Sequence, residues 1–137
     1  MNDDLTAPPV VFPGQAGPES AYAVAFDLLE RSAPAEALEV IEPALAEDPD
    51  NSGLRTLRAW AYLSRAQLGP AQKELERLVE DDPSDVWARH ALGRALERQS
   101  KYAEALPHLR LAAAMSGDRL HAAVAARVEA RLADQRD

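Results

Sequence analysis

The sequence predicts an all-α protein built from repeats, and two observations indicate this fold class. Three stretches follow one another in one register of 34 residues: APAEALEVIEPALAEDP ending at Pro49, GPAQKELERLVEDDP ending at Pro83 and KYAEALPHLRLAAAMSG ending at Gly117. From Glu19 onward, apolar residues recur at the spacing of amphipathic helices, and no strand candidate of useful length appears. Similarity at a fixed period of this size is typical of helical arrays, whose core is spread along an axis.

Residues 1–17 are expected to form a separate, Pro-rich and extended N-terminal segment. The stretch TAPPVVFPGQAGPE holds four prolines and two glycines. This composition excludes a helix and favours an extended or polyproline-like backbone. The helical periodicity begins only after this stretch.

The first helix pair is predicted within residues 18–51. The turn RSAP separates its two helices, with Ser32 as a candidate N-cap and Pro34 near the first turn, where a missing N–H costs little. The apolar residues that indicate the helices are Ala21, Val24, Ala25 and Leu28 in the first, and Ala37, Leu38, Ile41, Ala44 and Leu45 in the second.

Two further pairs are predicted within residues 52–85 and 86–117, followed by a last helix within residues 118–137. The expected helices of the second pair cover about residues 53–65 and 69–81. In the third pair, Ser84 or Asp85 caps a helix that ends near Arg98, and QSK forms the turn before a helix over about residues 102–114. The last helix is expected over about residues 119–133, and its apolar stripe consists of Leu120, Ala123, Val124, Val128 and Leu132.

Length, composition and charge exclude several classes of protein. The 137 residues fit one domain, and an apolar content of 47% argues against disorder. The absence of cysteine excludes disulfide scaffolds, thiolate metal sites and cysteine nucleophiles. A net charge of -8 argues against a nucleic-acid partner, whose phosphates basic residues would neutralise. No signal peptide or membrane span is evident, so a soluble, cytoplasmic protein is expected, and the Ala- and Arg-rich composition suggests a bacterial source.

The repeated stretches resemble the tetratricopeptide repeat (TPR) family. Small residues recur 34 apart near the start of each second helix, large apolar residues recur four positions later, and a helix-stopping residue closes each unit. This resemblance implies a right-handed α-solenoid of three repeats over residues 18–117, with the last helix as a cap. The positions that carry it are Ala37, Ala71 and Ala105, then Ile41, Leu75 and Leu109, then Pro49, Pro83 and Gly117.

Several residues depart from the family pattern. Ala21, Arg55 and Arg89 occupy the position of the Trp that the family carries early in the first helix, and Arg58 replaces an apolar residue. Prolines at positions 43 and 107 fall inside second helices, which they are expected to kink, on outward-facing positions.

The resemblance also implies a concave groove lined by the first helices, where a peptide or helix of another protein would bind. Four of the seven aromatic residues fall on this surface, and neighbouring exposed aromatic side chains typically mark an interaction patch. The expected groove residues are Tyr22, Phe26 and Leu29, then Thr56, Trp60 and Leu63, then Trp87, His90, Arg94 and Glu97.

Other interpretations of these residues stay open. Trp60 lies on a helix that is apolar nearly all round, so it is a candidate for burial, and Trp87 can equally pack against the preceding loop. The apolar residues Val10, Val11 and Phe12 form a possible self-docking tail that lies across Trp60 and Phe26, in the same chain or in a neighbour. The alternative is a flexible leader.

Charge at the other end of the groove suggests a partner that is apolar with some acidic character. His90, Arg94 and Arg98 give positive character there, unless the arginines are solvated or paired with Glu97 and Glu104. Some TPR proteins clamp a C-terminal carboxylate with Lys and Asn on the first helices. In this sequence Tyr22, Phe26 and Thr56 occupy most of those positions, so no such clamp is expected.

No motif for catalysis, cofactor binding or metal binding is found. The histidines at positions 90, 108 and 121 fall on different helices without i, i+4 pairing. The acidic clusters at 47–50 and 80–85 lack the spacing and central Gly of a calcium loop, and there is no phosphate loop. The leading hypothesis is a protein-interaction adaptor without enzymatic activity. The alternative is a self-associating structural unit, a homodimer formed by exchange of the tail or the cap helix.

Overall fold

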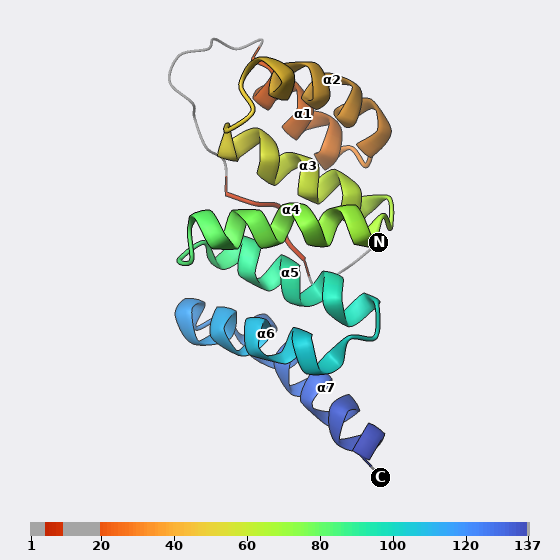
Figure 1. Cartoon of the computed structure of the whole chain (residues 1–137), viewed down its shortest axis with the longest axis vertical. Helices are drawn as coiled ribbons and strands as arrows, with labels where there is room; N and C mark the ends of the chain where they lie inside the picture. The colour runs from red at the N-terminus through yellow and green to blue at the C-terminus, as the bar shows by residue number, and fades with distance from the viewer. Residues whose placement is uncertain (1–4, 10–19, 137) are drawn as a thin grey trace. The chain divides into compact units, whose positions relative to one another are not determined.

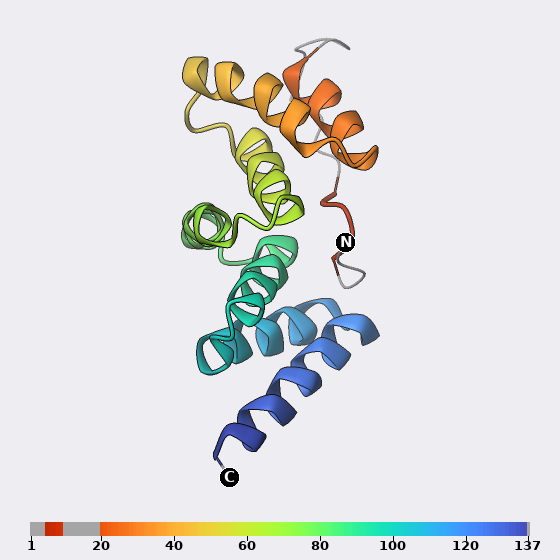
Figure 2. The same cartoon turned by 90° about the vertical axis from the view of Figure 1, so that its right-hand side faces the viewer.

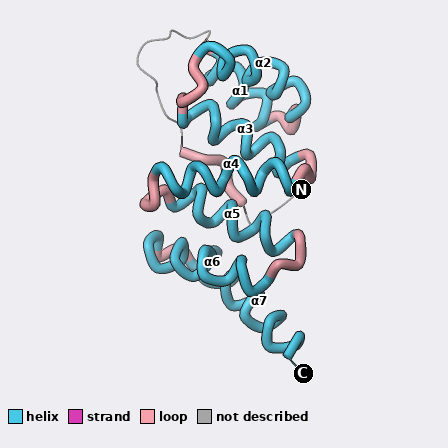
Figure 3. Tube along the Cα trace, viewed as in Figure 1, coloured by secondary structure: helices cyan, strands magenta, loops and turns pink. Residues whose placement is uncertain are grey.

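A computed structural model describes residues 5–9 and 20–136, and the regular structure of this part of the chain is entirely helical (Figure 1; Figure 3). Residues 5–9 carry no helix or strand. The fold is all-α, as the sequence predicts. The helices are α1 (Ala21–Glu30), α2 (Pro34–Glu47), α3 (Ser52–Ser64), α4 (Leu68–Asp81), α5 (Val86–Arg98), α6 (Tyr102–Ser116) and α7 (Arg119–Arg136). No helix among the described residues is long and apolar enough to cross a membrane.

Side-chain caps begin the first helix of each pair. Ser20 Oγ accepts from the Ala23 N–H at 3.3 Å, Asn51 Oδ1 from Leu54 at 3.0 Å, and Asp85 Oδ1 from Ala88 at 3.0 Å. Asp85 is therefore the cap of α5, one of the two candidates that the sequence offers.

The turns inside the pairs repeat with the period of the sequence. Ser32, Ala66 and Ser100 lie 34 residues apart and have φ angles of 61°, 57° and 62°. The prediction that Ser32 caps α2 is wrong: the cap residue is Ala33, which makes no side-chain bond, because Ser32 adopts the left-handed conformation one position earlier. Each pair of helices is thus joined by a tight turn that holds one residue at positive φ.

The described residues divide into two compact units. Unit 1 contains residues 7–9 and 20–74, and unit 2 contains residues 5–6 and 75–136. The division falls inside α4, whereas the predicted repeat boundaries fall in the loops. Those boundaries, and the separate status of residues 1–17, therefore remain predictions.

The core of unit 1 is formed by the facing sides of α1, α2 and α3. Ala25, Ala37, Ile41 and Leu57 are each 0% exposed. The apolar spacing of the sequence suggests that Val24 faces the core. In the structure its side chain is 41% exposed, so the inward face of α1 is a different one. The buried side chains of α1 are Tyr22, Ala25 and Leu29.

In unit 2, α6 packs against both α5 and α7 (Figure 2). Gly93 lets α5 approach α6 closely, since a Cβ at this position would lie 2.5 Å from Leu109 Cγ. Val124 and Val128 of α7 are buried as the expected stripe requires, but its Ala123 is exposed. Helix α7 therefore covers an apolar face of the preceding pair.

Candidate functional site

Three aromatic side chains of unit 1 form a continuous row. The Tyr22 and Phe26 rings, one turn apart on α1, stack with centroids 6.1 Å apart. Phe26 meets Trp60 of α3 edge-on at 5.6 Å. Offset and edge-on contacts are the geometries that aromatic pairs prefer. The row therefore joins the first helices of successive pairs, at three of the positions that the family resemblance assigns to the groove.

These rings are less exposed than the sequence-based hypothesis requires. Tyr22 and Trp60 are 7% and 8% exposed, and Phe26 is half-buried. Leu29 and Leu63 are buried as well, so the wall of the expected groove is part of the core of unit 1. Thr56 is only half-buried, and its hydroxyl donates to the Ser52 carbonyl at 2.9 Å.

Part of the N-terminal segment packs on this row within unit 1. The Tyr22 hydroxyl donates to the Pro9 carbonyl at 3.5 Å, and Pro8 is buried. The proposed docking residues Val10, Val11 and Phe12 lie outside the described residues. The described contacts are made by the residues just before them, and the Pro8–Pro9 pair is the sequence signal that identifies this stretch as preformed extended chain.

In unit 2, the side chain of Trp87 binds the backbone of the same segment. Its indole N–H donates to the Thr6 carbonyl at 2.8 Å, a short and well-formed bond. Trp87 is 8% exposed, and a buried indole N–H needs an acceptor. The Asp85 cap fixes the first turn of α5 and so positions this donor.

At the expected positive end of the groove, Arg94 and His90 are buried within unit 2, and one carboxylate is shared by two arginines. Arg94, 7% exposed, forms an ion pair with Glu97, which also accepts from Arg127 at 2.8 and 2.9 Å. His90 is 1% exposed, and its ring stacks on His121 of α7 at 4.0 Å. The preference for an acidic partner stays a prediction, and the burial of Arg94 and His90 limits direct contact of these two side chains with a partner.

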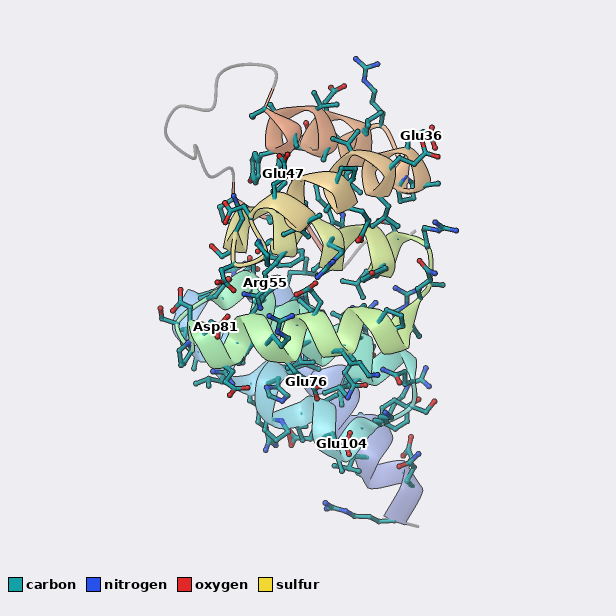
Figure 4. All side chains as sticks on the ribbon, turned by 45° about the horizontal axis from the view of Figure 1, so that its top comes forward. Glu36, Glu47, Arg55, Glu76, Asp81 and Glu104 are labelled. Carbon is teal, nitrogen blue, oxygen red and sulfur yellow. The ribbon has the colours of Figure 1, made fainter. Side chains whose placement is uncertain are left out.

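The residues that replace family positions in α3 form a buried ionic cluster, which the sequence did not predict. Glu74 of α4, 5% exposed, accepts from Arg55 Nε at 3.2 Å and from Arg58 Nε at 2.6 Å. Burial alone would lower the pKa of Arg58, but the hydrogen bond to Glu74 and the charges of Glu74 and Glu42 raise it. Figure 4 labels the buried Arg55 and, for contrast, five exposed acidic residues: Glu36, Glu47, Glu76, Asp81 and Glu104.

The described residues contain no group of three or more His, Asp or Glu side chains that could hold a metal ion. His108 lies beside a cation instead: its Nδ1 is 3.4 Å from Arg89 Nη1. Burial and, secondly, the charge of Arg89 lower the pKa of His108, with Glu76 acting in the opposite direction. These contacts assign the side chain to packing between helices.

Comparisons with known proteins agree with this architecture. The second TPR domain of human RPAP3, solved by NMR in complex with the HSP70 peptide SGPTIEEVD, has a TM-score of 0.73 and 21% identity over 80% of this chain and 92% of that one. MamA from AMB-1 has a TM-score of 0.64 and 23% identity over 72% of this chain and 54% of that one. A profile of the tetratricopeptide repeat family matches residues 28–96, half of the chain. This chain therefore belongs to the tetratricopeptide repeat family.

Proposed function

We propose that this chain is a protein-interaction scaffold, without catalytic activity, that binds an extended segment of another protein on its first helices. The observation that carries the proposal is the 2.8 Å bond from the Trp87 indole to the Thr6 carbonyl. This bond supports the proposal because the indole donor is held on a helix, α5, and binds a backbone carbonyl of a non-helical segment. A main-chain acceptor exists in every extended peptide, so the same donor suits a segment from elsewhere.

The aromatic row of unit 1 supports the same role. Tyr22, Phe26 and Trp60 offer flat apolar faces with one hydroxyl donor at the end, and aromatic-lined surfaces suit extended proline-containing segments. The fold neighbour RPAP3 binds an HSP70 peptide. Here, however, Tyr22, Phe26 and Thr56 occupy most of the positions of a carboxylate clamp. An internal, apolar segment is therefore the partner that this surface fits, and a terminal carboxylate is not needed.

A selection from a random peptide library, with the full-length chain as bait, tests the proposal. Selected peptides are expected to bind Trp87→Phe about tenfold more weakly, the factor that corresponds to one hydrogen bond. Leu111→Ala is the matched control, because Leu111 is exposed on α6, a second helix, and its truncation should leave binding unchanged. The peptide SGPTIEEVD serves as the negative probe.

Two results would overturn the proposal: the library enriches no peptide, or every selected peptide binds wild type and Trp87→Phe equally. The alternative function, self-association, is tested by sedimentation, which measures the mass of the same protein in solution. A mass that rises with concentration and falls after loss of the Trp87 donor would favour exchange of the N-terminal segment between chains.

A further inference from the structure

Residues 5–9 have the properties of a preformed ligand. The proline rings fix φ at Pro8 and Pro9, and a residue that precedes proline is restricted to extended backbone, which applies to Ala7 and to Pro8 itself. The stretch Leu5–Thr6–Ala7–Pro8–Pro9 carries no charge. Such a segment loses little conformational entropy when it docks, and it brings no charged group that must be desolvated.

The hydrogen bond with unit 2 is made to the backbone of this segment and not to the side chain of Thr6. Trp87 donates to the carbonyl oxygen of Thr6, whereas the Thr6 residue itself is exposed. Leu5, the preceding residue, is half-buried. An apolar side chain followed by an accepting carbonyl is thus what unit 2 selects.

The contact with unit 1 has the same character. Tyr22 donates to the carbonyl oxygen of Pro9, a residue that is otherwise exposed, while the ring of Pro8 is buried. At 3.5 Å this bond is weaker than the one in unit 2. The contact that unit 1 makes with the segment is therefore also to a backbone carbonyl.

We propose that residues 5–6 are an internal ligand at the Trp87 donor of unit 2, and that the partner is an uncharged, extended segment of the same kind, with an apolar residue followed by an accepting carbonyl. This inference rests on the proposed function and specifies its partner. The segment competes with the partner for the Trp87 donor, so binding in trans requires its displacement.

The test uses NMR of the full-length chain and follows the indole N–H signal of Trp87, assigned with Trp87→Phe. In Pro8→Gly/Pro9→Gly, the docked state loses its preorganisation. The exchange of this proton with solvent should then become about tenfold faster, the factor expected for loss of one hydrogen bond. The matched control is Pro13→Gly/Pro18→Gly, which changes two later prolines and should leave the exchange rate unchanged.

A second step asks whether the segment can be replaced in trans. The peptide Leu-Thr-Ala-Pro-Pro, added to Pro8→Gly/Pro9→Gly, should return the Trp87 signal to its wild-type position, and Leu-Thr-Ala-Gly-Gly should not. An equal exchange rate in wild type and Pro8→Gly/Pro9→Gly would show that the segment is not docked. If the peptide has no effect, the segment does not mimic a ligand. If the Trp87 signal of the wild type changes with protein concentration, the segment docks on a second copy of the chain. An empty library selection combined with a restored Trp87 signal would instead remove the proposed function and leave the docking intact.

Discussion

At the scale of single residues, the chain buries charged side chains of α3 and α4. Arg55 and Glu74 are 3% and 5% exposed, and Arg58 joins them from the next turn of α3. A buried ion pair contributes little compared with apolar residues, but the removal of one partner leaves an uncompensated charge. Glu74 is the member that holds both guanidinium groups.

We therefore expect Glu74→Gln to lower the free energy of unfolding by about 3 kcal/mol or more, because Arg55 would stay buried without a counter-charge. Urea denaturation measures the change. Glu42→Gln is the matched control: its side chain is 51% exposed and lies 3.5 Å from Arg58, so it should change stability by less than about 0.5 kcal/mol. Similar losses in the two variants would contradict the buried cluster.

His108 supplies a pH-dependent prediction. Its pKa is lowered in the fold by burial and then by Arg89, so the folded state binds a proton less readily than the unfolded state. The contribution of His108 is then present above about pH 6.5 and decreases as the pH falls through and below this value. His108→Gln should reduce the stability difference between pH 7.5 and pH 5, measured by urea denaturation. An unchanged difference would show that this histidine is not responsible.

At the scale of elements, the period of 34 residues appears in backbone conformation as well as in sequence. Ser32, Ala66 and Ser100 are at positive φ in equivalent turns. Ala37, Ala71 and Ala105 are all 0% exposed, as tight approach between helices requires. The sequence predicts the small residues, because close helix packing requires small side chains at a fixed spacing. It does not predict the positive φ of the turn residues, since Ser32 is expected there as a cap.

Gly93 gives the corresponding prediction for helix packing. A Cβ here would lie 2.5 Å from Leu109 Cγ, so Gly93→Ala forces α5 and α6 apart or moves Leu109 from its rotamer. We expect a loss of about 1–3 kcal/mol in the free energy of unfolding. Gly69→Ala is the control, since nothing lies within 4 Å of the added methyl group. If Gly93→Ala leaves the free energy of unfolding unchanged, then Leu109 or the helices move at little cost, which contradicts the prediction.

At the scale of the whole molecule, stability in repeat proteins is approximately a sum of neighbouring contacts. Val128→Ala, at a fully buried position of α7, should cost about 2 kcal/mol. Hydrogen exchange should show faster opening of α5, α6 and α7, with little change in α1, α2 and α3. Val24→Ala, at an exposed position, is the matched control. Uniform loss of protection throughout the chain would mean that the two units unfold together.

The sequence predicts the fold better than the surface. Helical period alone does not distinguish Val24 from Tyr22 as the inward residue of α1, and the large ring takes the buried position. The burial of Trp87 likewise cannot be predicted from its own helix, because its indole contacts a residue far away in the sequence, Thr6. That contact uses the carbonyl of Thr6, an atom common to all residues, so no side chain in the sequence marks it.

The bond between Thr6 and Trp87 has a quantitative consequence for competition. A covalently attached segment competes at an effective local concentration, whereas a partner must supply its own concentration. One net hydrogen bond of about 1 kcal/mol and a single covered ring give the detached peptide an affinity no tighter than roughly millimolar. Because docking of the segment is expected to protect the Trp87 indole about tenfold, it should weaken a rival by about the same factor. The attached segment therefore shields the Trp87 ring from non-specific contacts, and a ligand of micromolar affinity can still displace it.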